Sequence, residues 1–204
     1  MGIIRILKRE YEYLDNYHTD RKFRKVIRPF VSDLITSEDS SVHWKYLDVA
    51  GKAVLDLGCG LWEVKNIQEA SPVYFKNKGA KKIIGIDQSE SDIGVLKKYF
   101  GEHFPADGSE FLVKSIRTTK DITELITQYQ VESIKCDIEG FEKVLFGIEK
   151  DGLKNVINIS VEYHNRQLLL GLLQTFKKRR FTIINHSVFT YAPQTMGVIT
   201  AQRD

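Results

Sequence analysis

The sequence is poor in cysteine. Of its 204 residues only two are cysteines, Cys59 and Cys136, and they lie far apart with neither a CxxC nor a zinc-knuckle spacing. Disulfide frameworks and structural zinc sites need several cysteines at short, regular spacings. We therefore expect neither feature, and the pattern fits the reducing environment of the cytosol.

A strong net charge and long apolar runs are also lacking. The formal net charge is +3, whereas binding through phosphates usually shows as a dense basic stripe, so nucleic acid is a possible but not a favoured partner. No stretch approaches the roughly 18 consecutive apolar residues of a membrane span. The sequence thus predicts a cytoplasmic protein that does not enter a membrane, and it gives no indication of an oligomeric state.

What the sequence does contain is the pattern of one α/β domain. Apolar residues recur at helical spacing over about 3–17 and 21–35, so we predict an N-terminal helical extension or lid over residues 1–50. Over residues 51–204 short apolar runs alternate with amphipathic stretches, which is typical of a mostly parallel sheet with helices on both faces. We expect seven strands, over 53–57, 82–87, 111–113, 133–137, 156–162, 181–184 and 196–201, with the last two forming a hairpin. The expected helices span 89–100, 121–129, 141–150 and 166–178.

The first motif with functional content is Val-Leu-Asp-Leu-Gly-Cys-Gly, which ends at Gly60. A buried strand runs here into glycines, which let the backbone turn tightly and approach a ligand with no side chain between them. The next strand ends at Asp87, where a carboxylate can accept hydrogen bonds from both hydroxyls of a ribose. A generic strand and turn would explain the first motif alone, but the pair of motifs is more specific.

Together, Asp56, Gly58, Gly60 and Asp87 resemble the cofactor motifs of class I S-adenosylmethionine-dependent methyltransferases. The resemblance implies a Rossmann-like fold and S-adenosyl-L-methionine as the cofactor, with Asp56 near its methionine moiety and Asp87 at its ribose. The third glycine of a dinucleotide fingerprint is missing, so NAD is disfavoured. The candidate cofactor-binding residues are Asp56, Gly58, Cys59, Gly60, Asp87, Gln88 and Ser115.

The two acidic residues of these motifs are unusually far apart. Asp56 and Asp87 are separated by about 31 positions, where the fingerprint has about 20. We therefore expect an insertion over residues 62–73, which either covers the mouth of the site or forms a longer helix kinked at Pro72.

A second group of charged residues follows the fourth expected strand, in the run Lys-Cys-Asp-Ile-Glu-Gly-Phe-Glu. In an extended strand Lys135, Asp137 and Glu139 project to one side. Ligands bind at the carboxyl ends of the strands in open α/β sheets, and buried charges need partners. The next strand ends with Glu162 and His164, so these side chains converge beside the cofactor if the two strands are neighbours.

The block from Lys135 to Glu142, with Thr-Lys-Asp-Ile-Thr-Glu-Leu before it and Glu162 and His164 after it, is similar to the FkbM family of methyltransferases. The resemblance covers roughly residues 52–181 and implies O-methylation of a hydroxyl on a small molecule or sugar. The FkbM family usually has Glu-Pro after the second strand, where this chain has Asp-Gln.

Methyl transfer requires an aligned acceptor and removal of its proton. His164 is the expected base, because its ordinary pKa lies near neutrality, and Asp137 or Glu139 can serve if desolvated. In the structural alternatives a carboxylate merely holds His164, Glu139 caps a helix, and Lys135 neutralises Asp137. Grouped carboxylates can also bind Mg²⁺, but we predict no metal. The candidate catalytic residues are Asp137, Glu139, His164, Lys135 and Glu162.

Two other functions remain open. An RNA or protein methyltransferase would use the basic residues between 21 and 28 as a substrate arm, although such a run is more often the solvated face of a helix. The four prolines are isolated, so the Asn/Asp-Pro-Pro-aromatic motif associated with methylation of base amines is missing. A non-catalytic S-adenosylmethionine-binding module is the third possibility.

Overall fold

The computed structural model describes residues 33–35, 40–61, 64, 66–149, 151–189 and 196–203. Residues 1–32, which carry most of the expected helical extension and its basic run, therefore lie outside the described residues. The described part of that segment packs on the sheet, because Trp44, Leu47 and Val49 are buried in the same apolar cluster as Val54.

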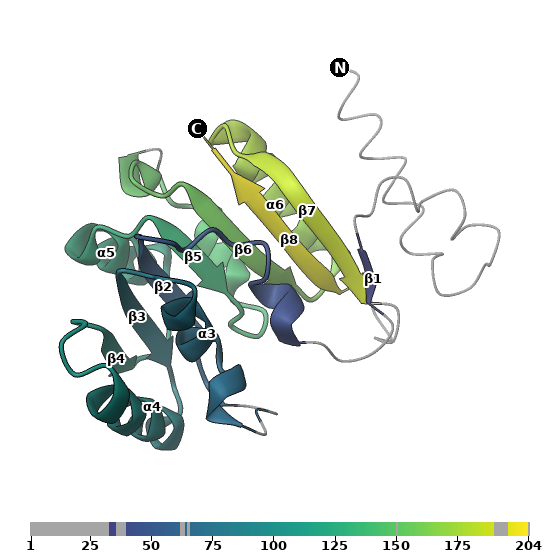
Figure 1. Cartoon of the computed structure of the whole chain (residues 1–204). Helices are drawn as coiled ribbons and strands as arrows, with labels where there is room; N and C mark the ends of the chain where they lie inside the picture. The colour runs from purple at the N-terminus through teal and green to yellow at the C-terminus, as the bar shows by residue number, and fades with distance from the viewer. Residues whose placement is uncertain are drawn as a thin grey trace.

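The centre of the molecule is a sheet in which eight strands are described, in the order β1-β7-β8-β6-β5-β2-β3-β4 (Figure 1). All neighbouring strands are parallel except β8, which runs antiparallel to β6 and to β7. The strands are β1 (Asp33–Ile35), β2 (Ala53–Leu57), β3 (Lys82–Asp87), β4 (Glu110–Val113), β5 (Ser133–Cys136), β6 (Asn158–Tyr163), β7 (Thr182–Phe189) and β8 (Gly197–Gln202). This arrangement confirms the predicted Rossmann-like, mostly parallel sheet and its closing hairpin.

The short strand β1 was not predicted. The sequence pattern places residues 33–35 at the end of a helix, and that expectation is wrong because they pair in parallel with β7. An edge strand presents unpaired backbone N–H and C=O groups, and an added strand satisfies them. Pairing with the free edge of β7 therefore outweighs the helical spacing of the side chains.

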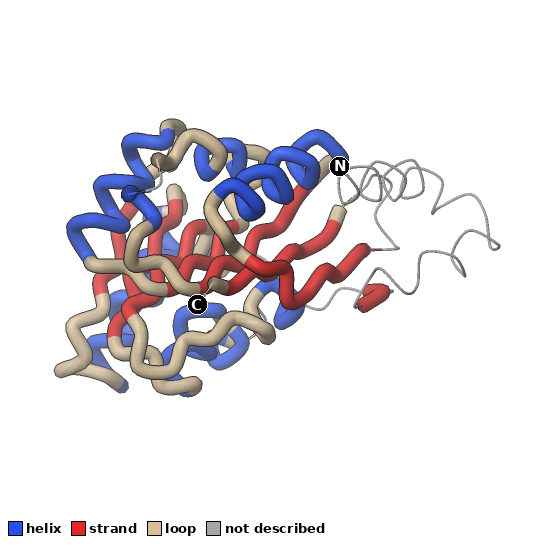
Figure 2. Tube along the Cα trace, turned by 90° about the horizontal axis from the view of Figure 1, so that it is seen from above, coloured by secondary structure: helices blue, strands red, loops and turns tan. Residues whose placement is uncertain are grey.

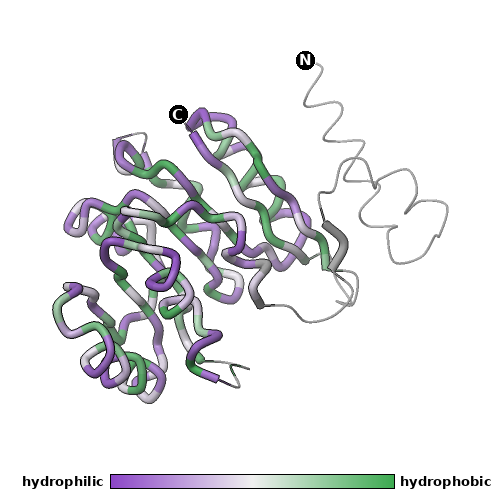
Figure 3. The backbone as a smooth tube through the Cα atoms, viewed as in Figure 1, coloured by the Kyte–Doolittle hydropathy of each residue, from purple (hydrophilic) through white to green (hydrophobic). Residues whose placement is uncertain are grey.

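Helices cover both faces of the sheet (Figure 2). One apolar cluster joins the sheet to α3 (Ser71–Asn77), α4 (Glu90–His103) and the residues after the 3₁₀ helix η1 (Ser40–His43). The other joins the opposite face to α5 (Thr119–Tyr129), α6 (Arg166–Lys178) and the 3₁₀ helices η3 (Glu142–Leu145) and η4 (Asp151–Leu153). A further 3₁₀ helix, η2 (Ile67–Glu69), precedes α3. Figure 3 shows hydrophobic residues along the strands between these two layers.

Local signals explain where most helices begin. The side chain of Ser89 accepts a hydrogen bond from the Asp92 backbone N–H at the start of α4, and Thr118 and Asp121 form a capping box at the start of α5. Pro72 lies in the first turn of α3, where its missing N–H costs nothing. The proline therefore starts a helix and does not kink one.

The α-helix expected over residues 141–150 is wrong, because only the short 3₁₀ helix η3 forms there. The carboxylate of Glu142 turns back and accepts hydrogen bonds from the backbone N–H groups of Ile138 and Gly140. Gly147 then interrupts the segment, and glycine disfavours a continuous helix.

A row of buried polar residues crosses the sheet on the face that α3 covers. Asp56 of β2 is the register partner of Lys135 on β5, which pairs with Ser160 on β6, and Ser160 pairs with Thr200 on β8. All four side chains are buried. Because these residues are register partners, they form one row across the sheet. The row lies one residue before the carboxyl ends of β2 and β5 and continues onto β6 and β8.

The described helices include none with both the length and the apolar character that a membrane crossing requires.

Candidate active site

The glycine bend after β2 requires both of its glycines. Gly58 has a φ of +73°, and a Cβ there would lie 1.7 Å from the backbone carbonyl oxygen of Asp137. A Cβ on Gly60 would lie 2.8 Å from Oδ2 of Asp87. The backbone N–H groups of Gly58 and Cys59 both donate to the Ile86 carbonyl oxygen, at 2.9 and 3.2 Å. The bend is therefore held against β3, with no side chain between its backbone and the end of that strand.

Asp87 points into this bend. One carboxylate oxygen accepts a hydrogen bond from the Gly60 backbone N–H at 2.9 Å, and the other accepts one from the Ser89 N–H at 2.8 Å. Each oxygen keeps a second lone pair, because a carboxylate has about four acceptor positions. The carboxylate is thus fixed in orientation and still able to accept two hydroxyl donors.

The other candidate cofactor residues differ in their exposure. Gln88 and Ser115 are exposed at the ends of β3 and β4, whereas Cys59 is fully buried. Burial, and the nearby charge of Asp56, raise the pKa of the Cys59 thiol well above its ordinary value, so the thiol packs as a small apolar group.

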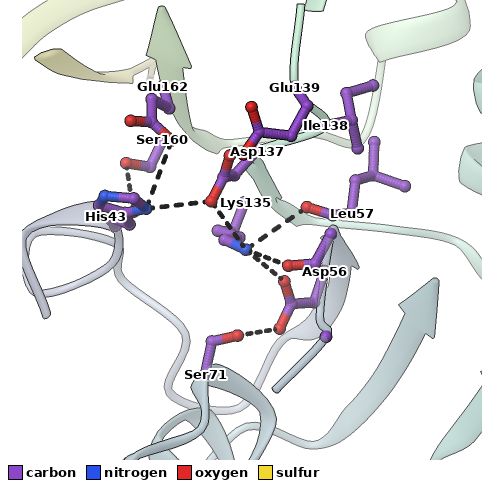
Figure 4. Close-up of polar contacts among 12 residues, drawn as sticks. His43, Asp56, Leu57, Ser71, Lys135, Asp137, Ile138, Glu139, Ser160 and Glu162 are labelled. Carbon is purple, nitrogen blue, oxygen red and sulfur yellow. Dashed lines mark hydrogen bonds and ion pairs between the residues drawn. The ribbon is translucent and has the colours of Figure 1, made fainter. Parts of the chain in front are cut away.

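Lys135 lies between the glycine bend and the acidic residue Asp137 that follows β5 (Figure 4). Its Nζ lies 3.4 Å from Oδ1 of Asp56 and 3.8 Å from Oδ2 of Asp137, and it donates a hydrogen bond of 2.6 Å to the carbonyl oxygen of Gly58. Lys135 is 3% exposed and Asp56 is fully buried. The ammonium group therefore holds the glycine bend in place and balances two carboxylates, which gives it a positioning role.

Charges around Lys135 explain the ionisation of this group. Burial alone would lower the pKa of Lys135, but the carboxylates of Asp56 and Asp137 raise it above its ordinary value. Burial raises the pKa of Asp56, against the opposing effects of Lys135 and of the Ser71 hydroxyl, which donates a hydrogen bond of 2.6 Å. Asp56 thus acts on the bend through Lys135, whose ammonium group contacts Asp56 and binds the Gly58 carbonyl oxygen.

Asp137 and Glu162 meet at the ends of β5 and β6, and His43 approaches both. Nδ1 of His43 lies 3.2 Å from Oδ2 of Asp137 and 3.8 Å from Oε2 of Glu162 (Figure 4). The hydroxyl of Ser160 donates to the His43 carbonyl oxygen at 2.8 Å, and the imidazole stacks on Phe189 with 5.8 Å between ring centroids. The histidine is therefore fixed against β6 and β7 although it comes from the N-terminal part of the chain.

The pKa values of Asp137 and Glu162 are shifted in opposite directions. Burial would raise the pKa of Asp137, but the Lys135 ammonium and hydrogen bonds from His43 and Glu162 hold it well below its usual range. Burial, the charge of Asp137 and the hydrogen bond to it raise the pKa of Glu162. The two neighbouring carboxyl groups therefore differ in how readily they lose a proton.

His164 lies between Glu142 and Glu139. Its Nδ1 is 3.3 Å from Oε1 of the fully buried Glu142, and its Nε2 is 3.4 Å from Oε2 of Glu139 and 3.7 Å from Oε2 of Glu162. Burial would lower the pKa of His164, but the hydrogen bond and charge of Glu142 raise it above its ordinary value. Glu142 therefore orients the ring so that Nε2 faces the other carboxylates.

Glu139 is not placed as the sequence analysis expected. Strand β5 ends at Cys136, and Glu139 lies in a turn with a φ of +51°, so it does not project from the strand beside Lys135 and Asp137. Its side chain is 86% exposed, forms an ion pair with His164 and lies within 4.8 Å of Asp137. A non-glycine residue in the left-handed region is strained and is enriched at functional sites. Glu139 caps no helix, because Glu142 binds the backbone of this turn.

Two residues of the site were not among the candidates. Glu142 was quoted only as the last residue of a motif, and its burial beside His164 could be inferred only from the fold. His43 is separated from Asp137 by 94 positions and carries no sequence signal of its own. Both surround the same group of acidic residues at the edge of the sheet.

The arrangement has two parts with different chemistry. The glycine bend and Asp87 offer an open backbone and a carboxylate with unused acceptor positions, the features that a nucleoside-binding site requires. Across Lys135, the ends of β5 and β6 offer carboxylates and imidazoles, which can accept a proton. In an open α/β sheet both lie at the edge where ligands bind.

No model of a known protein family matches the chain, and no curated protein sequence matches it. Solved structures with the same fold include magnesium protoporphyrin IX methyltransferase (ChlM) from Synechocystis PCC 6803 with bound S-adenosylmethionine, at a TM-score of 0.53 and 12% identity over 96% of this chain and 97% of that chain. TrmK of M. capricolum with S-adenosylhomocysteine gives a TM-score of 0.55 and 10% identity, over 80% of this chain and 66% of that chain. A putative tRNA (m1A22) methyltransferase from Streptococcus pneumoniae gives 0.52 and 16%, over 82% and 70%. At these identities the comparisons establish the Rossmann-like fold that these methyltransferases share.

Proposed function

We propose that the protein is an S-adenosylmethionine-dependent methyltransferase that methylates a hydroxyl of a small molecule or sugar. The observation that carries the proposal is the position of a group of proton acceptors directly beside a glycine bend that carries a hydroxyl-binding carboxylate. Lys135 connects the two parts, because it contacts Asp137 and the Gly58 carbonyl oxygen at once. The shared fold with methyltransferases that bind S-adenosylmethionine or its product supports the assignment.

The residues around the bend fit this cofactor. The free lone pairs of Asp87 suit the two ribose hydroxyls, and the close approach of Gly60 to Asp87 leaves no room for a side chain there. The exposed Gln88 and Ser115 lie on the same edge of the sheet, where the adenine of the cofactor would bind. When bound, the cofactor supplies an electrophilic methyl group on a sulfonium. The protein then has to align the acceptor and remove its proton.

The chemistry of the second part favours a hydroxyl as the acceptor. A hydroxyl must lose its proton during transfer, whereas a ring nitrogen with a free lone pair needs no base before it attacks. His164, oriented by Glu142, is the proposed proton acceptor, and the ionised Asp137 orients the acceptor hydroxyl. The run from Lys135 to Glu142 also carries the resemblance to the FkbM family, which supports the same acceptor class.

An RNA methyltransferase is the second candidate. Two of the structures with the same fold are described as a putative tRNA (m1A22) methyltransferase and a putative rRNA methylase. The proton-accepting group beside the bend is the observation that ranks a hydroxyl acceptor above the ring nitrogen of a base. Binding to tRNA that falls steeply with salt would favour this second candidate.

The test is transfer of a labelled methyl group from S-adenosylmethionine to sugars, small alcohols and tRNA, after calorimetry with S-adenosylhomocysteine. We expect product-cofactor binding and label in a hydroxyl acceptor. Asp87→Ala should weaken binding by about 1–3 kcal/mol, since it removes a charged hydrogen-bond acceptor, whereas Glu90→Gln on the exposed start of α4 should not.

His164→Ala should slow transfer and leave cofactor affinity nearly unchanged, with the exposed His103→Ala as its control. Binding without transfer to any acceptor would instead support a non-catalytic S-adenosylmethionine-binding module. Failure of the wild-type protein to bind S-adenosylhomocysteine would refute the assignment.

A further inference from the structure

The side chains at the ends of β5 and β6 have the spacing of metal ligands. One potential ligand atom from each of His43, Asp137 and Glu162 lies within 4.8 Å of the others, and so do atoms of Asp137, Glu139 and His164. Metal–ligand bonds of about 2.1 Å place neighbouring ligand atoms about 3.0–3.4 Å apart in octahedral or tetrahedral geometry. The contacts of 3.2 Å (His43–Asp137), 3.8 Å (His43–Glu162) and 3.7 Å (His164–Glu162) need only small adjustments to reach this range.

An independent feature of His164 indicates the same kind of site. A histidine that binds a metal through one ring nitrogen usually donates its other N–H to a carboxylate. Here Nδ1 faces Glu142 at 3.3 Å, while Nε2 faces the carboxylates of Glu139 and Glu162. Glu142 is fully buried and is itself fixed by the backbone N–H groups of Ile138 and Gly140. The ring is thus presented by a rigid support toward the other potential ligands.

The buried carboxyl groups around these side chains also favour the binding of a cation. The carboxyl groups of Asp56, Asp137, Glu142 and Glu162 lie here, all largely buried. Within the described part of the chain, the Lys135 ammonium group is paired with Asp56 and Asp137. The imidazoles of His43 and His164 face Glu162, and His164 also faces Glu142. An isolated buried carboxylate is costly, and a bound divalent ion removes that cost.

We propose that His43, Asp137 and Glu162, with His164 as a fourth ligand, bind one divalent transition-metal ion. Imidazole nitrogens mixed with carboxylates suit Zn²⁺, Mn²⁺ or Co²⁺ better than Mg²⁺, which prefers oxygen ligands and water. The sequence analysis considered Mg²⁺ on the grouped carboxylates and predicted no metal, and His43 was not among its candidates. The role of the ion rests on the proposed function: it would polarise the acceptor hydroxyl, His164 would be a ligand in place of the base, and the exposed carboxylate of Glu139, 3.4 Å from His164, would take the hydroxyl proton.

The alternative is a metal-free group in which protons alone balance the charges, with a proton on Glu162. The two differ in a direct binding measurement. The full-length protein is freed of metal with a chelator and titrated with Co²⁺, whose visible absorption reports its ligands. We expect saturation at one ion per chain and bands of a site with mixed nitrogen and oxygen ligands.

Variants then identify the ligands. His43→Ala and Glu162→Gln should abolish the Co²⁺ bands, and Glu142→Gln should weaken binding by about 10- to 100-fold, as expected for loss of a partner that orients a ligand. The exposed His103→Ala is the control and should bind as the wild type does. Circular dichroism verifies that each variant is folded. Should a variant fail to fold, paramagnetically shifted imidazole N–H signals from two histidines in the wild-type Co²⁺ protein provide the same test.

Absence of saturable Co²⁺ binding, or unchanged bands in folded His43→Ala and Glu162→Gln, would overturn the metal site. Methyl transfer that continues in the presence of chelator would do the same while leaving the methyltransferase assignment intact. Conversely, Co²⁺ binding by these residues with no S-adenosylhomocysteine binding would support the metal site and remove the proposed function. The two proposals can therefore fail separately.

Discussion

Replacing Lys135 with methionine tests the buried connection between the glycine bend and the acidic residues. Methionine has a similar length, but it leaves Asp56 and Asp137 without the ammonium group that lies 3.4 and 3.8 Å away. Removing one partner of a buried ion pair costs about 3–5 kcal/mol, because the remaining charge is buried without compensation. We expect Lys135→Met to lower the free energy of unfolding by this amount, a large part of the stability of an ordinary domain.

Two further variants isolate the cause. Lys82→Met removes a partly exposed lysine that lies 3.5 Å from the exposed Glu110, and surface pairs contribute at most about 1 kcal/mol. The double variant Lys135→Met with Asp56→Asn removes one of the two unpaired charges and should recover part of the loss. The wild type, Lys135→Met, Asp56→Asn and the double variant form a double-mutant cycle.

Urea denaturation followed by circular dichroism measures these free energies, with the slope of the transition as a check for two-state unfolding. A loss below about 1 kcal/mol for Lys135→Met at an unchanged slope would refute the reasoning, since such a small loss is typical of exposed pairs. So would a double variant that is no more stable than Lys135→Met, because the Asp56 carboxylate would then not be the unpaired charge.

The remaining predictions concern the bend and the response to acid. Gly58→Ala should destabilise the fold far more than Gly51→Ala; both have positive φ, but only at Gly58 would the new Cβ meet backbone, so similar melting temperatures would contradict the packing argument. Burial lowers the pKa of His186 to about 4, whereas an unfolded histidine has a pKa of about 6.5. The unfolded chain therefore binds this proton first, and stability should fall by up to about 3 kcal/mol as pH falls from about 6.5 to 4. His186→Gln should remove this loss in urea titrations at pH 7 and 4.5, while the exposed His103→Gln should keep it.

The sheet could be predicted because its signals are local. Strands β2 and β3 are uninterrupted apolar runs with clear ends, and their predicted bounds agree with the structure. Helix α6 was also predicted with its observed ends, since apolar residues at helical spacing lie within the segment. Strand β1 was missed because its pairing with β7 joins residues about 150 positions apart.

Only the site residues whose positions follow from the order of the strands could be predicted from the sequence. Asp137 and Glu162 could be brought together from the rule that neighbouring parallel strands end at one edge. The turn at Glu139 and the reversal of Glu142 depend on backbone hydrogen bonds that no spacing indicates. His43 depends on how the chain before β2 returns over the sheet, which requires the tertiary structure itself.

The polar row from Asp56 through Lys135 and Ser160 to Thr200 has a consequence for assembly of the sheet. Side chains alternate along a strand, so a slip of β5 by one residue would turn Lys135 toward the apolar layer beneath α5 and α6. An ammonium group stranded there, far from Asp56, would make the misaligned sheet too unstable to persist. The same strand register that pairs Lys135 with Asp56 therefore also places the candidate site residues. A chain that reaches the stable fold has these residues in their final positions.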